Sequence, residues 1–273
     1  MTLTADSGST KTAWFCDGLT FETQGLNPLT TPDADIAATL EQVTGRLGGR
    51  PVDRVVFYGA GCATEPMRRK VAQHLGEVFP QAVTEVGTDM LGACRGFGDA
   101  SCEGLVGILG TGSNACYYDG KAIVFGHRSL GYIFGDEGSG NHIGRCLLKD
   151  CLEMRMPRTL ATLFSDQYGI THPAAIECLY GKPNAGRWLA SLAPFASDNI
   201  GDPYIANLVE QCMESYFYHI VEPLRKMAQE GGYGHSDQLR MVGGIANAFA
   251  GQLRAVAARH QIEIMAIQSA PKY

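Results

Sequence analysis

Short runs of apolar residues separated by glycine-containing turns predict that the chain opens with strands. The first 24 residues are interpreted as three strands: Thr2–Ala5, Thr12–Cys16 and Thr20–Thr23. Apolar positions at helical spacing then predict a helix over Asp33–Leu47, between Pro32 and Gly48. The elements predicted next are the strand Val52–Tyr58, the helix Met67–Phe79, the strand Val83–Val86 and the helix Asp89–Gly96. The pattern therefore predicts three strands followed by alternating helices and strands.

The opening pattern returns from residue 104. It predicts the buried strand Gly104–Leu109, a glycine turn, the strand Ala115–Tyr118, a second turn and the strand Ala122–Phe125. Two such units favour a duplicated fold whose halves face each other. Hairpins are common, so a coincidental likeness is the alternative that the pattern leaves open.

The remainder of the chain is predicted to be mostly helical. The expected elements are the helix Ser139–Leu152, a long helix over Asp202–Gln229 interrupted at Pro223, the strand Gln238–Val242, the helix Ala246–His260 and the strand Ile262–Ile267. No long linker or low-complexity segment divides the chain.

Composition narrows the class of protein. Of 273 residues, 45% are hydrophobic and 18% charged, which excludes a disordered chain. The net charge of −6 gives no attraction for nucleic acid. No signal peptide or membrane-length apolar run is found, so we expect a soluble, cytoplasmic protein without a membrane partner. The nine cysteines form no C-x-x-C pair, which indicates reduced thiols rather than disulfides or a zinc site.

The first glycine turn carries a set of residues suited to an anion. Asp6-Ser7-Gly8-Ser9-Thr10-Lys11-Thr12 is not a P-loop, because the P-loop spacing is absent and a strand follows. Its backbone N–H groups and hydroxyls could still bind phosphate, with Asp6 holding Mg²⁺ through water and Lys11 offsetting charge. The alternative is a solvated hairpin in which Asp6 only caps the turn.

Two further glycine elements suggest a nucleotide. Gly110-Thr111-Gly112-Ser113-Asn114 occupies the equivalent turn of the second unit, so the two hairpins could bind a polyphosphate together. Gly243-Gly244 lies between a strand and a helix, where backbone could approach a nucleoside. Each element alone is a weak signal, and the three in this order are a strong one.

These motifs make the chain resemble the sugar kinase, heat-shock chaperone and actin superfamily, and within it the N-acetylglucosamine kinase and BadF-type ATPase group, nearly end to end. The matching residues are Asp6, Gly8, Thr10, Lys11 and Thr12, the turn Gly110–Asn114, the sequence Gly135-Asp136-Glu137-Gly138-Ser139, and Gly243-Gly244-Ile245-Ala246. The resemblance is closest to bacterial proteins assigned as N-acetylglucosamine kinases.

The resemblance implies an α/β fold of two actin-like (ribonuclease H-like) lobes, each βββαβαβα, with a central cleft. The expected lobes are residues 1–102, with the first phosphate motif, the catalytic aspartate and part of the sugar site, and residues 103–273, with the second phosphate motif, the adenosine motif and a helical insertion. The implied activity is ATP- and Mg²⁺-dependent phosphorylation of an amino sugar, most of all N-acetyl-D-glucosamine at its 6-hydroxyl. A homodimer is left open.

Residue roles also follow from the resemblance. Asp89, which by itself would be a helix N-cap, aligns with the catalytic base in Thr88-Asp89-Met90-Leu91-Gly92-Ala93. The implied ATP and phosphate contacts are Gly8, Ser9, Thr10, Lys11, Thr12, Gly110, Thr111, Gly112, Ser113, Gly243 and Gly244. The implied substrate contacts are Asn27, Gly61, Asp89, Thr111, Gly131 and Asp136. For Asn27, a plain turn residue before Pro28 is the alternative reading.

The chain departs from the family at two points. Leu130 precedes Gly131 where the animal enzyme has tryptophan, which leaves recognition of the N-acetyl group open. Only Gln268–Tyr273 follow the last predicted strand, whereas relatives continue with a segment that packs toward the first domain. His127 and His142 are expected to be structural, because we see no partner histidine or cysteine at ligand spacing.

Two rival functions remain at this stage. One is an ATPase that activates a 2-hydroxyacyl-CoA dehydratase, although none of the cysteines lies in the motif expected for its iron–sulfur cluster. The other is a sugar- or nucleotide-binding protein without turnover, which the presence of Asp6, Thr10 and Asp89 disfavours.

Overall fold

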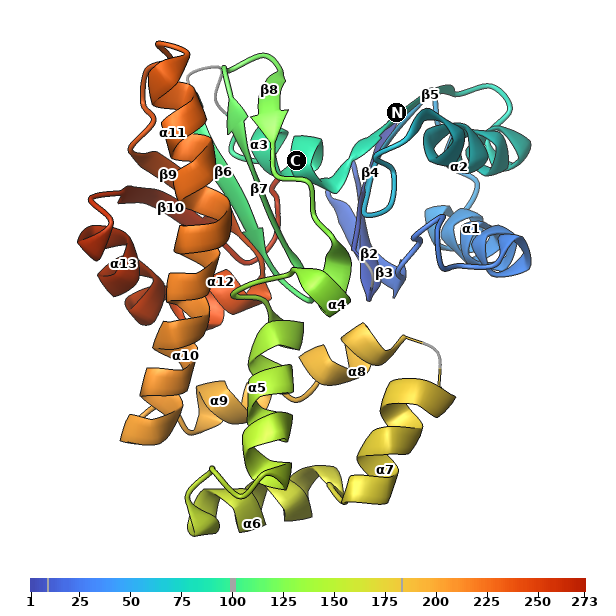
Figure 1. Ribbon diagram of the computed structural model, residues 1–273. Helices are drawn as coiled ribbons and strands as arrows, with labels where there is room; N and C mark the ends of the chain where they lie inside the picture. Colours follow the sequence, from blue (N-terminus) through green and yellow to red (C-terminus); the bar gives the residue numbers. More distant parts are fainter. Residues whose placement is uncertain (9, 99–101, 183) are drawn as a thin grey trace. The chain divides into compact units, whose positions relative to one another are not determined.

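The computed structural model describes residues 1–8, 10–98, 102–182 and 184–273. The chain divides into two compact units, Met1–Asp99 together with Pro271–Tyr273, and Ala100–Ala270 (Figure 1). The sequence analysis had assigned the last three residues to the second lobe, but they fold with the first. The reason is aromatic packing, because the ring of Tyr273 stacks on Tyr58 with centroids 5.5 Å apart.

Each unit is built on a five-stranded mixed sheet. The first sheet has the order β3-β2-β1-β4-β5 and the second β10-β9-β6-β7-β8. The strands of the first sheet are β1 (Thr2–Ser7), β2 (Lys11–Cys16), β3 (Leu19–Gln24), β4 (Arg54–Gly59) and β5 (Val83–Thr88). Those of the second are β6 (Gly104–Leu109), β7 (Ser113–Tyr118), β8 (Ile123–Gly126), β9 (Gln238–Val242) and β10 (Glu263–Gln268).

The two sheets share one topology. In the first, β1 pairs antiparallel with β2 and parallel with β4, and β4 pairs parallel with β5. In the second, β6 pairs antiparallel with β7 and parallel with β9, and β9 pairs parallel with β10. Chance hairpins would not reproduce the parallel pairs as well, so the duplicated, actin-like fold expected from the sequence is confirmed.

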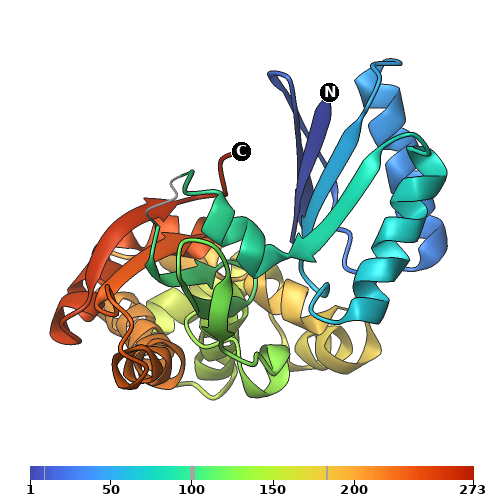
Figure 2. The same ribbon diagram turned by 90° about the horizontal axis from the view of Figure 1, so that it is seen from above.

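Three helices complete the first unit: α1 (Asp33–Leu47), α2 (Glu65–Val78) and α3 (Asp89–Arg95). Alternate residues of the central strands point to one face, where Leu3 and Phe57 are buried in a core shared with Val43 of α1 and Leu75 of α2. Figure 2 shows α1 and α2 side by side on this face. Tyr58 points the other way and contacts α3, which therefore covers the opposite face.

The second unit carries a helical insertion between β8 and β9. Its helices are α4 (Gly131–Phe134), α5 (Gly140–Leu152), α6 (Arg158–Tyr168), α7 (His172–Ile176), the π-helix η1 (Glu177–Gly181), α8 (Ala185–Ala190), α9 (Pro194–Asp198), α10 (Pro203–Tyr216), the π-helix η2 (Phe217–Val221) and α11 (Glu222–Glu230). α12 (Gly244–Ala248) and α13 (Ala250–Arg259) follow β9. Figure 1 shows α6 at the end of α5 that lies away from the sheet.

Two predicted helices differ from the structure. The helix expected over Asp202–Gln229 is α10, η2 and α11 in one run, and its π-helical turn lies just before Pro223. Proline lacks an N–H and its ring crowds the carbonyl one turn earlier, which a wider turn relieves. The helix expected over Ala246–His260 begins earlier and breaks at Phe249. Among the described residues, no helix combines the length and apolarity needed to span a membrane.

Candidate functional site

Two carboxylates lie near each other in the first unit. Asp6 is on β1 and Asp89 begins α3 directly after β5, so both stand where parallel strands end, the edge at which α/β folds bind ligands. Burial raises the pKa of Asp6 to about 6, the negative charge of Asp89 adds to the rise, and Lys11 opposes it. Burial also raises the pKa of Asp89, although the Met90 N–H, 2.9 Å from Oδ1, favours its charged form.

The hairpin of the first unit that is predicted to bind phosphate is closed by its own backbone. Gly8 is exposed, and its N–H donates to the carbonyl of Lys11 at 2.9 Å. The ammonium of Lys11 forms an ion pair with Glu22 on β3. Thr12 is buried and its hydroxyl lies 2.8 Å from Ser7 Oγ. The Thr12 hydroxyl and the Gly8 N–H therefore have partners within the unit, and the phosphate contacts expected of Gly8, Thr10, Lys11 and Thr12 stay predictions. Ser9 lies outside the described residues.

Two predicted sugar contacts, Asn27 and Gly61, are brought together. Gly61 has φ +82°, and a Cβ built there would lie 2.1 Å from Asn27 Oδ1. The same Oδ1 accepts the Leu29 N–H at 3.0 Å, which makes Asn27 an Asx-turn residue as the alternative reading proposed. Among the residues that the structure describes, the Asn27 amide nitrogen makes no hydrogen bond, so the turn and a sugar contact are compatible.

In the second unit, Asp136 holds the hairpin Gly110–Asn114, the second segment predicted to bind phosphate. Its Oδ1 accepts the Ser113 N–H at 3.1 Å and its Oδ2 accepts Asn141 Nδ2 at 2.8 Å. A Cβ at Gly112 would lie 2.9 Å from the same carboxylate, so only glycine allows this approach. Asp136 is 9% exposed. Its direct role is to position the hairpin, and its predicted sugar contact stays a prediction.

The same hairpin is joined to the start of α5 and to Gly243-Gly244, the segment predicted to bind adenosine. The carbonyls of Gly110 and Thr111 accept the N–H groups of Gly140 and Asn141 at 2.9 and 3.1 Å. Gly243 has φ +128°, and a Cβ there would lie 2.1 Å from the carbonyl oxygen of Leu109. The structure therefore unites three predicted elements of the second unit that are far apart in the sequence.

Gly131 begins the short helix α4 with φ +68°, and its N–H donates to Ser129 Oγ at 3.2 Å. Leu130, the residue that stands in place of the expected tryptophan, is 70% exposed. Ile133 and Phe134 of α4 are exposed as well. The predicted contact of Gly131 with a sugar is not tested by these observations.

The sequence analysis was wrong in finding no cysteine at ligand spacing from His142, whereas the structural role expected for this residue stays a prediction. His142 lies with Cys146 and Cys212 in a group whose ligand-type atoms are all within 4.8 Å of one another. The signal was present, because His142 and Cys146 are one helical turn apart on α5 and share a face. Cys212 comes from α10, and no local pattern could have predicted it.

Comparison with known proteins places this geometry in context. No protein-family model and no curated protein matches the chain. A solved protein from Porphyromonas gingivalis, described as a putative N-acetylglucosamine kinase, is 33% identical, with a TM-score of 0.91, 99% of this chain and 95% of that one being covered. One from Chromobacterium violaceum with the same description is 20% identical over 99% of this chain and 95% of that one, with a TM-score of 0.68.

More distant matches share the fold alone. A ROK family glucokinase from Streptomyces griseus, solved with glucose and AMPPNP, is 16% identical, covers 98% of this chain and 94% of its own, and has a TM-score of 0.56. The family of this chain is therefore assigned from its similarity to the Porphyromonas gingivalis protein.

Proposed function

Because the chain belongs to the N-acetylglucosamine kinase family of the actin-like ATPase superfamily, we propose that it transfers the γ-phosphoryl group of ATP to an amino sugar. The proposed acceptor is the 6-hydroxyl of N-acetyl-D-glucosamine. ATP is made and used in the cytoplasm, which is the compartment we propose for the reaction. The proposal assigns the acceptor and its base to the first unit and the nucleotide to the second.

The observation that carries the proposal is the environment of Asp89. The acceptor hydroxyl must lose its proton as its oxygen attacks phosphorus, and a positioned carboxylate can accept that proton. Burial raises the pKa of Asp89, and a carboxylate with a raised pKa is a stronger base once it is ionised. The Met90 N–H bound to Oδ1 fixes the orientation of the group.

Asn27 and Gly61 are proposed to orient the acceptor. The Asn27 amide is held by the Leu29 N–H and packs against the bare backbone of Gly61. An amide group can donate to one sugar hydroxyl and accept from another, which favours a polyol over an apolar ligand. A fixed amide keeps the acceptor oriented toward its base.

A divalent cation fits the carboxylates of the first unit. Asp6 and Asp89 repel each other, and the cationic side chain that opposes this repulsion at Asp6, Lys11, is paired with Glu22. Carboxylate oxygens are the ligands Mg²⁺ prefers, often through water. Asp6 is the residue we propose to hold it. The ion, when bound, neutralises charge on the phosphate oxygens.

The nucleotide is proposed to lie along the second hairpin and the adenosine motif. A Cβ at Gly110 or at Gly244 would meet no atom within 4 Å, so the backbone there borders open space that a ligand could fill. Asp136 holds the hairpin through the Ser113 N–H, and Gly243 packs against Leu109 and Gly110 at the start of the same hairpin. Backbone N–H groups in such turns favour phosphate.

The test is a coupled ADP-release assay with N-acetylglucosamine, glucosamine, N-acetylmuramic acid, N-acetylmannosamine and glucose. We expect N-acetylglucosamine to stimulate release most. Asp89→Asn should lower kcat by about 10²–10⁴-fold, since that is the usual contribution of a general base, with little change in KM for ATP. The control is Asp166→Asn, which makes the same change on the exposed face of α6.

The outcomes separate the parts of the proposal. If none of the sugars raises ADP release above background, the chain is not an amino-sugar kinase. If a different sugar is preferred, the kinase stands and the N-acetylglucosamine assignment fails. If Asp89→Asn turns over like Asp166→Asn, Asp89 is not the base.

A further inference from the structure

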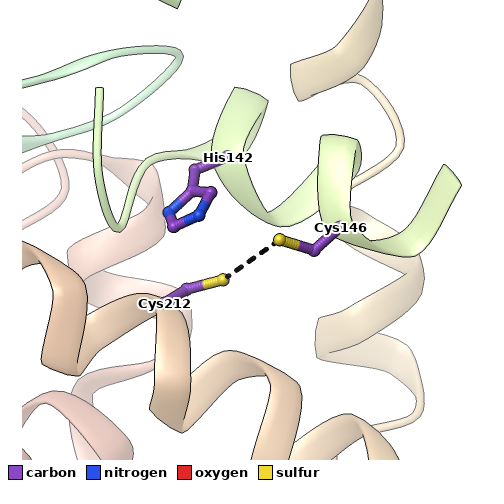
Figure 3. A group of neighbouring side chains, drawn as sticks. All are labelled: His142, Cys146 and Cys212. Atoms are coloured by element: carbon purple, nitrogen blue, oxygen red, sulfur yellow. Dashed lines mark hydrogen bonds between the residues drawn. The ribbon is translucent and has the colours of Figure 1, made fainter. Parts of the chain in front are cut away.

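Three reactive side chains of the second unit lie together outside the residues assigned to the reaction. His142 and Cys146 are on α5 and Cys212 is on α10 (Figure 3). The two sulfur atoms face each other, and their separation is 4.0 Å. Cys146 is partly exposed and Cys212 is 2% exposed. Cys146 is therefore the more exposed residue of the two.

The hydrogen bond from Gly138 determines which ring nitrogen of His142 carries the proton. The Gly138 N–H donates to His142 Nδ1 at 3.0 Å, so this nitrogen carries the lone pair. In the neutral ring the proton is then on Nε2. A histidine that binds a metal through Nε2 has its proton on Nδ1, which would face the N–H of Gly138. The donor arrangement therefore favours a thiolate partner over a metal ion.

The surroundings of the two thiols shift their pKa values in opposite directions. The Cys212 S–H donates to Cys146 and His142 adds a second hydrogen bond, so the pKa of the Cys146 thiol is lowered in spite of burial. The same contact and burial raise the pKa of the Cys212 thiol. Of the described residues, the other charged or titratable groups that act on this pair are Arg145 and Asp150 of α5 and Tyr204 of α10.

We propose that Cys146 and Cys212 are a redox-active pair that a hydroperoxide converts into a disulfide. The Cys146 thiolate attacks one peroxide oxygen, and the O–O bond breaks. The other oxygen departs as hydroxide, and Cys146 becomes a sulfenic acid. Cys212 sulfur then attacks the Cys146 sulfur, the S–S bond forms, and the S–O oxygen leaves as water with the Cys212 proton. Two thiols and one H₂O₂ thus give one disulfide and two waters, and a dithiol reductant reverses the change.

The Gly135–Ser139 segment contacts α10 at Cys212, through Gly138. A Cβ at Gly138 would lie 3.3 Å from the Cys212 carbonyl oxygen and 2.7 Å from Tyr216 Cβ, so the segment packs on α10 at this point. A disulfide requires sulfurs about 2 Å apart, so its formation moves side chains of α5 and α10 beside this contact. The disulfide itself does not depend on the proposed kinase activity.

The test treats the reduced full-length protein with a small excess of H₂O₂ and maps thiols by peptide mass spectrometry. We expect one linked Cys146–Cys212 peptide pair, about 2 Da lighter than the two free peptides, that dithiothreitol reverses. Cys151→Ser is the matched control, because Cys151 is a partly buried cysteine on the same helix. It should oxidise like the natural protein.

The variants distinguish the steps. Cys212→Ser should stop at a sulfenic acid on Cys146 that dimedone traps, and Cys146→Ser should leave Cys212 reduced. His142→Gln should slow alkylation of Cys146 by iodoacetamide at pH 6 at least about 5-fold and less at pH 9, a pH-dependent loss that misfolding alone would not produce. Circular dichroism checks that each variant is folded.

Three results would overturn the proposal. The first is a disulfide between any other pair of cysteines. The second is over-oxidation of Cys146 without a disulfide. The third is binding of one Zn²⁺ from ZnCl₂ with sub-micromolar Kd that is lost in Cys146→Ser, which would make the cluster a metal site instead.

Discussion

Asp6 carries a charge that the first unit accommodates poorly. Its pKa of about 6 reflects burial first and the charge of Asp89 second. A rise above the ordinary value near 3.9 means that ionised Asp6 destabilises the fold, on the order of 2–3 kcal/mol. A residue that only capped the turn would not need a charge that destabilises the fold. The raised pKa therefore favours a ligand-binding role for Asp6 over a turn-capping role.

Asp6→Asn should therefore stabilise the protein at pH 7.5 in the absence of Mg²⁺ and ATP. The penalty is full above the folded pKa of about 6 and disappears as pH falls below the unfolded-state value near 3.9, where the aspartate is protonated in both states. The thermal midpoint of Asp6→Asn should exceed that of the natural protein by several degrees at pH 7.5 and match it near pH 3. An equal gain at both pH values would contradict the prediction, and exposed Asp35→Asn is the control.

The contact between Gly61 and Asn27 gives a second prediction at this scale. Gly61→Ala forces Asn27 away, because the new Cβ would lie 2.1 Å from Oδ1. We expect KM for the sugar to rise about 10-fold or more. A rise of this size corresponds to the loss of roughly one hydrogen bond between the sugar and the displaced Asn27 amide. Gly18→Ala is a matched control, since Gly18 has φ +78° but open space around it. Equal KM values for the sugar in the two variants would show that Asn27 does not contact the acceptor.

At the scale of elements, the sequence predicts helices best where their ends are marked. Helix α1 has the predicted bounds, because Pro32 precedes it and Gly48 closes it in the left-handed conformation. The helices between residues 153 and 202 were expected only as helical in general. All of them except α6 have five or six residues, too few for a periodic signal. The π-helical turn before Pro223 was expected only as an interruption, because a proline signal marks where a helix is disturbed and does not specify the wider turn that relieves the disturbance.

Gly243 links two such elements, and its substitution is the prediction for this scale. Gly243→Ala places a Cβ 2.1 Å from the Leu109 carbonyl oxygen at φ +128°, which no L-residue adopts readily. We expect a loss of at least about 2 kcal/mol in the free energy of unfolding, measured by urea denaturation. Gly244→Ala, with open space and an ordinary φ, should change stability by less than about 1 kcal/mol.

At the scale of the whole molecule, the duplicated sheet was predictable and the convergence of distant residues was not. Twin strand–turn–strand patterns are local, so they predicted both sheets. In contrast, Asp136 holds Gly112 and Ser113 across the α4 segment, and Cys212 meets Cys146 across several helices. Such contacts arise from tertiary packing, which a single sequence does not display.

The chain's last three residues show the same limit, because their partners lie at the other end of the sequence. The ring of Tyr273 stacks on Tyr58 and meets Phe15 edge-on, with centroids 5.5 Å apart in both cases. Pro271 packs against Gly96. Burial raises the pKa of Tyr273, and the charges of Asp6 and Asp89 raise it further, so the phenol stays neutral beside them.

Deleting Pro271–Tyr273 should therefore loosen the first unit and leave the second unchanged. Losing two aromatic contacts and the contact with Gly96 should cost about 1–3 kcal/mol. Amide hydrogen exchange should become faster in β2, β4 and α3, which contact these residues, and stay the same in β6 and β7. Tyr273→Phe keeps the stack and should exchange like the natural protein. Uniformly faster exchange in both sheets would show that these residues do not belong to the first unit alone.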